Sequence, residues 1–369
     1  MSVPPLFHFA ESYNDADQFY LSGFLCPDPF AVLELGRGKV VLAVSPMEEE
    51  RARTESTGER VIALRRRKGQ NLVQGLAGFI RGNGAEHVRV LPGFPLGLAR
   101  ELSKENIGIE VDGKSLAVRR RKKTGGQIRA IQQVQRGCES AMEMARSLLA
   151  GCPVRAGVLI FEGRHLTAER LRALIEIHLL ERGLETADTI AAPGRGGARP
   201  HWRGEGPVRA GVPIVIDIFP RSRETRYHSD MSRTFVVGRA SATVREMHRA
   251  VCEAQDAALH VLGAGVALDD VHKAVCDVFR RRGYGVPAGG KTPRRGFLHG
   301  TGHGLGLEVH ETPSVSVTGD IFGPGDVVTV EPGLYDRRIG GVRVEDVVAC
   351  MPDGSVRNLT KFPRDLEIL

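Results

Sequence analysis

Three acidic residues in the second half of the chain lie where a polar side chain is unexpected. Asp217 ends an apolar run of valine and isoleucine, Asp230 directly precedes a second apolar run, and Glu331 follows Val327–Val330. A carboxylate is costly to bury unless it is paired or binds a cation. Taken alone, Asp217 also suits a salt bridge with one of the many arginines, and Asp230 suits a turn.

A fourth carboxylate, Glu345, belongs to the strand-like segment 341–348. Alternation with period two places Arg343 and Glu345 on one face of this strand, with Val342 and Val344 on the other. In isolation this pattern favours a cross-strand ion pair on a solvated face.

A segment rich in glycine, 299–311, holds three of the twelve histidines, His299, His303 and His310. Glycines let the backbone approach a ligand closely and set imidazoles at defined angles. The Gly-x-Gly-x-Gly string has no nucleotide-type strand before it and no helix pattern after it, so it does not predict a phosphate-binding loop. Solvated histidines and metal-bound histidines both fit this segment.

Taken together, these residue types indicate a metal centre. Four carboxylates that share one site repel strongly, and a pair of divalent cations relieves that repulsion. Oxygen-rich ligands with one imidazole suit Mn²⁺, Co²⁺ or Zn²⁺, and no cysteine is needed. Two such ions lower the pKa of a water molecule and polarise a carbonyl group. The candidate ligands are Asp217, Asp230, Glu331, Glu345 and one histidine of the segment 299–311.

Helices and strands must interleave to position these residues, so we expect an α/β or α+β fold. The apolar periodicity of the sequence predicts several helices and strands. Helices are predicted over 127–150 and 166–181, from a Thr243–Glu246 capping box to about 262, and around 271–279. Strands are predicted over 30–35 and 39–44, flanking Gly36-Arg37-Gly38 as a hairpin, and over 212–218 and 234–237.

Length and charge indicate the number of domains and the kinds of binding partner to expect. The 369 residues suggest two or three domains, and the basic run 119–123 marks the best boundary, giving domains 1–123 and 124–369. The net charge of +7 is local, because this run and the run 65–68 hold nine positive charges, without which the balance is −2. Short runs of this kind are usually solvated loops or linkers, so we do not expect a nucleic acid partner.

The remaining composition bears on location. No segment approaches the roughly 18 uncharged apolar residues of a membrane span, and the first residues do not read as a signal peptide. The six cysteines are scattered and include no Cys-x-x-Cys pair. They indicate reduced thiols, so we expect a cytoplasmic protein that does not bind membranes.

At the candidate ligands the sequence resembles the pita-bread metallopeptidases, the superfamily of methionine aminopeptidases, Xaa-Pro aminopeptidases and prolidases. The resemblance covers about residues 127–369 and rests on four motifs in the order typical of the family. These are Ser-Asp-Met-Ser-Arg-Thr-Phe at 229–235, His-Gly-Thr-Gly-His-Gly-Leu-Gly at 299–306 followed by Glu-Val-His-Glu at 308–311, Val-Glu-Pro-Gly-Leu-Tyr at 330–335, and Arg-Val-Glu-Asp at 343–346.

The resemblance implies roles for the site residues. The implied metal ligands are Asp217, Asp230, His303, Glu331 and Glu345, with Asp230 and Glu345 bridging two ions. The implied catalytic residues are His201, His310, Glu331 and Arg343. Glu331 would act as general base and acid, and Arg343 matches the arginine of proline-directed members. His201 would hydrogen-bond the substrate, and His310 would stabilise the tetrahedral intermediate.

Residues 1 to about 125 resemble the additional domain of creatinase, aminopeptidase P and prolidase. The implied fold is therefore a creatinase-like α/β domain followed by a C-terminal pita-bread domain. The implied activity is dinuclear-metal-dependent hydrolysis of Xaa-Pro bonds at the N-terminus of dipeptides or short peptides, by a homodimer. A methionine aminopeptidase, a general dipeptidase and a non-catalytic peptide-binding protein of this fold remain alternatives.

Overall fold

A computed structural model describes residues 3–36, 38–65, 68–113, 115–186 and 188–369. The chain forms two compact units, Met1–Val118 and Arg119–Leu369. The basic run 119–123, which the sequence analysis puts at the end of the first domain, lies in the second unit. Two features named above fall partly outside the described residues, since Arg37 of the hairpin and residues 66–67 of the other basic run belong to the gaps. No helix in the described ranges has both the length and the apolar character needed to span a bilayer.

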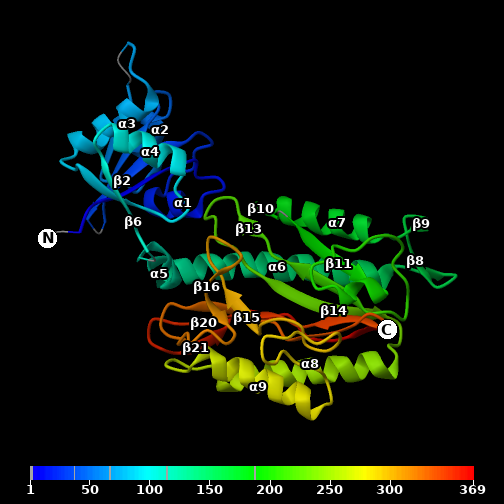
Figure 1. Cartoon of the computed structure of the whole chain (residues 1–369). Coiled ribbons are helices and arrows are strands. Elements are labelled where there is room, and N and C mark those ends of the chain that lie inside the picture. Colours follow the sequence, from blue (N-terminus) through cyan, green and yellow to red (C-terminus); the bar gives the residue numbers. More distant parts are fainter. Residues whose placement is uncertain (1–2, 37, 66–67, 114, 187) are drawn as a thin grey trace. The chain divides into compact units, whose positions relative to one another are not determined.

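The first unit is a mixed sheet with helices on both faces (Figure 1). The six strands run in the order β4-β3-β2-β1-β5-β6. Alternate residues of each strand point to opposite faces, so one face packs on α3 and α4 and the other on α1 and α2. The elements are β1 (Leu6–Ala10), α1 (Ala16–Ser22), β2 (Phe30–Gly36), β3 (Lys39–Val44), α2 (Glu49–Glu55), β4 (Arg60–Ala63), α3 (Leu72–Gly82), β5 (His87–Val90), α4 (Leu96–Lys104) and β6 (Gly108–Val111).

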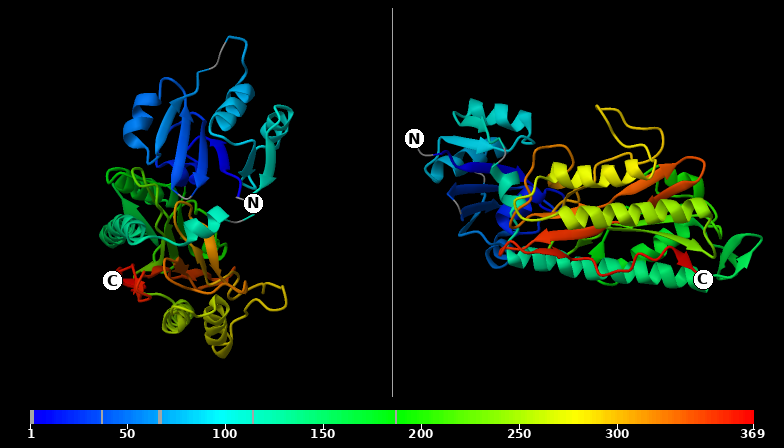
Figure 2. Two further views of the ribbon diagram at one scale, coloured as in Figure 1. Left: turned by 90° about the vertical axis from the view of Figure 1, so that its left-hand side faces the viewer. Right: turned by 90° about the horizontal axis from the view of Figure 1, so that it is seen from below.

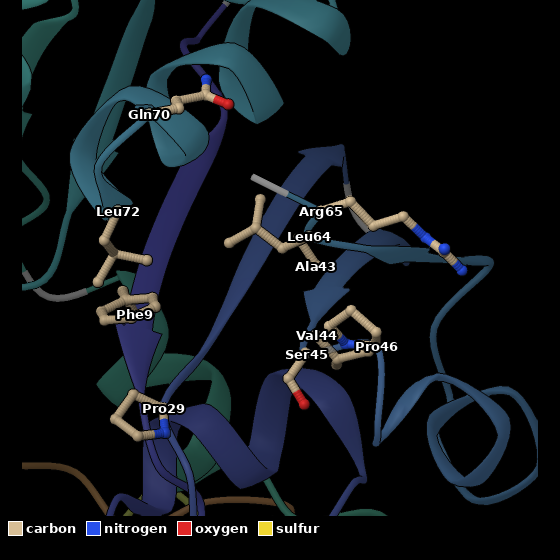
Figure 3. A pocket seen from close by; sticks show the side chains of 10 residues that line it. All are labelled: Phe9, Pro29, Ala43, Val44, Ser45, Pro46, Leu64, Arg65, Gln70 and Leu72. Carbon is tan, nitrogen blue, oxygen red and sulfur yellow. The ribbon is translucent and has the colours of Figure 1, made fainter. Parts of the chain in front are cut away.

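A hollow of about 770 Å³ lies in the first unit beside the end of β3 (Figure 3). Phe9, Leu64 and Leu72 form an apolar part of its wall, and Ser45 and Arg65 add polar groups. None of the sequence-predicted site residues lines it. The predicted chemistry therefore belongs to the second unit.

One half of the second unit is the antiparallel group β11-β12-β14, extended by β22 and covered by the helices α6 and α7. The capping box of Thr124 and Gln127 begins α6, whose buried face repeats at helical spacing. The boundary between the units falls within α5 (Ser115–Arg121). The elements of this half are α6 (Gly125–Gly151), β7 (Val154–Arg155), β8 (Val158–Phe161), β9 (Arg164–His165), α7 (Ala168–Leu180), β10 (Leu184–Glu185), β11 (Thr189–Pro193), the 3₁₀ helix η1 (Gly194–Ala198), β12 (Ile214–Ile218), β13 (Arg221–Ser222), β14 (Met231–Val237) and β22 (Glu367–Ile368).

The other half is the sheet β16-β15-β17-β20-β21 with the hairpin β18-β19. The helices α8 and α9 lie side by side against it (Figures 1 and 2), and their apolar faces share a core with β17, β19 and β20. The elements are α8 (Ala242–Val261), α9 (Leu268–Arg281), β15 (Gly302–Gly304), β16 (Glu311–Val315), β17 (Val327–Val330), β18 (Gly333–Asp336), β19 (Gly340–Arg343), β20 (Asp346–Cys350) and β21 (Val356–Asn358).

Two local predictions are wrong. Helix α8 is capped by Ser241, whose hydroxyl accepts from the Val244 amide, and not by a Thr243–Glu246 box. Thr243 already lies within the first turn, and Glu246 pairs with arginines instead. The basic run 119–123 is not a solvated linker, because Arg120 and Lys123 are buried and ion-paired.

Candidate metal centre

Strands β12 and β14 carry the two aspartates. Asp217 is the fourth residue of β12 and stands opposite Ser232 of β14, and Asp230 directly precedes β14. Both aspartates are buried. With period two, Asp230, Ser232 and Thr234 share one side of β14. That side is lined with polar groups although the whole strand is buried.

Glycines bring His303 into position on the short strand β15. A Cβ on Gly302 would lie 2.0 Å from the carbonyl oxygen of Thr329, and one on Gly304 would lie 2.5 Å from that of Glu311. Only glycine therefore lets β15 fit between β16 and β17. The His303 Nδ1 atom lies 3.1 Å from the Gly304 carbonyl oxygen and donates to it. This leaves the Nε2 lone pair facing the carboxylates, as a metal ligand requires.

Glu331 and Glu345 come from neighbouring antiparallel strands. Glu331 follows β17 and Glu345 precedes β20, which pairs with β17. One carboxylate oxygen of Glu331 lies 3.5 Å from the His303 Nε2 atom, and one of Asp230 lies 3.7 Å from it. Ligand atoms of Asp230, His303 and Glu345 all lie within 4.8 Å of one another. Residues far apart in sequence thus form one cluster.

Arg343 connects Asp217 to the rest of the cluster. Its Nη2 atom donates to Asp217 Oδ2 at 2.6 Å, and its Nε atom donates to the Ser232 hydroxyl at 2.8 Å. The same hydroxyl donates to Glu345 Oε2 at 2.9 Å. Arg343 and Glu345 therefore bond the same hydroxyl. The continuous strand predicted over 341–348 is wrong, because Val344 and Glu345 separate β19 from β20. The interpretation of Glu345 as a member of an ion pair on a solvated face is wrong, because both residues are buried and Arg343 pairs with Asp217.

The electrostatics of the cluster fit a divalent cation. Burial, followed by the charges of Glu345 and Asp217, raises the pKa of Asp230 well above its usual value. Burial also raises the pKa of Glu345, with Glu331 as the next cause. Within the described residues, Oδ1 of Asp217 and Oδ1 of Asp230 are buried and have no hydrogen-bond donor. Buried oxygen atoms of this kind call for a cation.

A pocket of about 260 Å³ opens beside the cluster. It is lined by the predicted residues His201, His303, His310, Glu331 and Arg343 and by His299. The rings of His303 and His310 meet edge to face, with centroids 4.3 Å apart. Burial, followed by His303, lowers the pKa of His310, so this ring stays neutral at neutral pH.

Several residues that support the site are not predicted from the sequence. Tyr335 links two pocket residues, since its hydroxyl lies 2.9 Å from His299 Nε2 and 2.9 Å from Arg343 Nη1. Ser232 bonds Arg343 and Glu345 as above, and the Thr234 hydroxyl exchanges hydrogen bonds with the Arg343 backbone. The alternation Asp-x-Ser-x-Thr at 230–234, directly before the apolar residues 235–237, is the signal that could have identified Ser232 and Thr234.

Replacement of Asp230 by asparagine is expected to stabilise the metal-free protein at neutral pH. The pKa of Asp230 lies above its ordinary value of 3.8 in the folded state. The folded protein therefore binds the proton more tightly than the unfolded chain. Stability then falls as pH rises from the unfolded pKa to the folded one.

The variant removes this loss, because an amide carries no charge. We expect the metal-free variant to be more stable at pH 8 by about 0.5–2 kcal/mol, the usual gain from one stabilising substitution. The difference should shrink as pH falls. Thermal melts of both proteins in excess chelator between pH 5 and pH 8 measure it. A variant that melts below the wild type at pH 8 contradicts the idea that repulsion dominates.

Comparisons with known proteins agree with this geometry. A family model described as metallopeptidase family M24 matches residues 129–352. Over 240 residues the chain is 31% identical to the Xaa-Pro dipeptidase of Pyrococcus furiosus, a stretch covering 64% of this chain and 63% of that protein. The alignment therefore spans less than two thirds of the length of this relative.

Two solved structures are similar over almost the whole chain. The X-Pro aminopeptidase from Thermotoga maritima matches with a TM-score of 0.84 and 26% identity, covering 99% of this chain and 97% of the other. The prolidase from Pyrococcus horikoshii matches with a TM-score of 0.81 and 26% identity, covering 99% and 95%. These matches confirm the predicted fold class and the resemblance on which it rests.

Proposed function

We propose that this chain, which belongs to metallopeptidase family M24, hydrolyses Xaa-Pro bonds at the N-terminus of dipeptides or short peptides, using two divalent cations. The observation that carries the proposal is the meeting of Asp230, His303 and Glu345 beside a pocket lined by His310 and Arg343. The printed names of its relatives, Xaa-Pro dipeptidase and X-Pro aminopeptidase, support the substrate class.

The metal ions would be held by the residues with the matching donor types. These are Asp217, Asp230, His303, Glu331 and Glu345. We propose Mn²⁺, Co²⁺ or Zn²⁺, because these ions accept carboxylates together with one imidazole. When bound, the ions lower the pKa of a water molecule and polarise the substrate carbonyl.

Glu331 is the proposed proton carrier. Its side chain lines the pocket and is 17% exposed, so it can meet both water and substrate. A carboxylate in this position accepts a proton from the attacking water and delivers it to the departing nitrogen. This proton is needed because the departing nitrogen leaves as an amine. The nitrogen of an Xaa-Pro bond carries no hydrogen, so a site that required an N–H donor there would reject the substrate.

The two histidines would form hydrogen bonds with the substrate. Because the pKa of His310 is lowered, its neutral ring can donate an N–H to the oxygen on which negative charge develops. His201 lines the same pocket and would hydrogen-bond the substrate. The guanidinium of Arg343 lies at the pocket with its donors directed to Asp217, Ser232 and Tyr335. It therefore offers a rigid wall against which the proline ring can orient.

A proline-release assay on the purified protein tests the proposal. We expect cleavage in the presence of Mn²⁺ or Co²⁺ and its loss in excess chelator. Cleavage of an Xaa-Pro dipeptide only indicates a dipeptidase, whereas cleavage of an Xaa-Pro-Xaa tripeptide indicates an aminopeptidase. If neither is cleaved with two metals bound per chain, proline specificity is refuted, and Met-initiated peptides and general dipeptides are the next substrates.

We also propose a homodimer that works in the cytoplasm. The dimer is proposed from the resemblance to prolidases and aminopeptidase P. All six cysteines are free, as suits a reducing compartment. Light scattering on the enzyme should give twice the chain mass of 40.1 kDa, and a mass equal to one chain refutes the dimer.

A further inference from the structure

Four consecutive basic residues, Arg120 to Lys123, do not behave as a solvated run. We call them the basic strap. Arg120 and Lys123 both pair with Glu311, whose side chain is only 5% exposed. Arg121 and Lys122 both pair with Asp326, whose side chain is fully buried. The strap thus supplies two positive charges to each of two buried carboxylates.

Glu311 is held by both side chains and backbone. It accepts from Lys123 Nζ at 2.8 Å and from Arg120 Nη2, and also from the Leu307 and Glu308 amides at 2.9 Å and 3.2 Å. Burial raises the pKa of Glu311, but Lys123 and Arg120 outweigh it, so the pKa lies below its usual value. A charged carboxylate therefore closes the loop 306–311 on itself.

This loop carries a proposed catalytic group. His310 is the residue next to Glu311, and its ring lies against that of His303. Glu311 also begins β16 and pairs with Gly304 of β15. A Cβ on Gly306 would lie 2.5 Å from the Glu311 carboxylate, which shows how closely the loop wraps this side chain. Any shift of the Glu311 carboxylate is therefore transmitted to the turn that presents His310.

The second pair of contacts fixes the strand that leads to Glu331. Arg121 donates to both oxygens of Asp326 at 2.9 Å, and Lys122 Nζ lies 3.0 Å from one of them. Asp326 directly precedes β17, and Glu331 directly follows it. The strap therefore binds two carboxylates. One is Glu311, which is next to His310, and the other is Asp326, which precedes the strand that ends before Glu331.

We propose that the basic strap and Glu311 are positioning residues, which hold His310 in register with the metal cluster through the buried Arg120–Glu311–Lys123 contacts. This inference rests on the proposed function for the role of His310. Its structural part, the ordering of the loop 306–311 by Glu311, stands apart from any substrate. Breaking a buried pair at one partner leaves an uncompensated charge, so the contacts resist rearrangement.

The test compares Glu311→Gln with Glu308→Gln. Glu308 bonds the same Arg120 Nη2 atom at 2.7 Å, but its side chain is 58% exposed. We expect Glu311→Gln to lower kcat for an Xaa-Pro dipeptide about 10- to 100-fold, the usual effect of losing a partner that orients a ligand or catalytic group, with metal content and KM little changed. Glu308→Gln should stay within about twofold, because exposed ion pairs contribute little.

Hydrogen exchange supplies a readout that needs no substrate. The amides of Leu307 and Glu308 should exchange at least tenfold faster in Glu311→Gln and in Lys123→Met, and at the wild-type rate in Glu308→Gln and Lys123→Arg. Lys123→Arg keeps the positive charge beside Glu311, so it is the variant to measure if the others do not fold. Its kcat should lie within about threefold of the wild-type value.

Three results overturn the proposal: an unchanged kcat in a folded Glu311→Gln protein, a loss of kcat without faster exchange in 306–311, or a Lys123→Arg enzyme as impaired as Lys123→Met. If the wild type cleaves no Xaa-Pro peptide, the function fails instead, and the exchange rates alone still decide whether Glu311 orders the loop.

Discussion

Replacing Glu331 by glutamine is expected to lower kcat for an Xaa-Pro dipeptide by about 10³-fold, within the range for loss of a general acid–base group. Glutamine keeps the size and one oxygen of the side chain but cannot take up and release a proton at neutral pH. The amide at Glu331, which donates to the Thr301 carbonyl at 2.8 Å, is unaffected, so the strand end should keep its place. The measurement is steady-state turnover at saturating metal and substrate.

Metal content decides how the Glu331 result is read. Glu331 is also a proposed ligand, so the variant must be assayed with its metal-to-protein ratio determined on the same sample. A fall in kcat at unchanged metal content supports the proton role. Loss of a metal in step with activity would support a ligand role only. Turnover near the wild-type value with both metals bound would remove Glu331 from the proton pathway.

Sequence periodicity predicts the long helices of the second unit and a few of its strands, because their apolar faces are long and regular. The helix expected over 127–150 is α6, and the strand expected over 212–218 contains β12. The cap of α8 is different, since a serine, a threonine and a glutamate all stand near its start. Which of them caps the helix depends on where the extended chain leaving β14 turns, a tertiary effect that local pattern does not contain.

Site residues can be predicted from the sequence where their type is unusual for their position. A carboxylate in an apolar strand, such as Asp217, has few physical explanations. The structure shows its ion pair with Arg343, and its role as a metal ligand stays a prediction. Supporting hydroxyls such as Ser232 are harder to find, since serine is common in ordinary strands. The basic strap was misinterpreted for a similar reason. A run of cations is usually solvated, and its acidic partners, Glu311 and Asp326, lie about 200 residues away in the sequence.

Replacing Arg343 by methionine is expected to lower kcat/KM for an Xaa-Pro dipeptide by about 10³-fold. Arg343 is 3% exposed and makes charge-assisted contacts with Asp217, Ser232 and Tyr335. Its loss removes the guanidinium partner of the buried Asp217 carboxylate, and breaking a buried pair of this kind typically costs about 3–5 kcal/mol. Part of this cost appears as lost stability, and the part expressed at the transition state lowers the rate.

A matched variant separates these two parts. Arg233 is likewise buried, at 1%, and pairs with Asp346 at 2.9 Å, but it does not line the pocket. Arg233→Met should lower the melting temperature to a similar extent while preserving the ratio of Xaa-Pro to Xaa-Ala cleavage. Arg343→Met should reduce that ratio at least tenfold, and Tyr335→Phe, which removes one partner hydroxyl, should reduce it less. An equal loss of kcat/KM on both substrates in Arg343→Met would mean that this arginine stabilises the metal centre and does not distinguish proline from alanine.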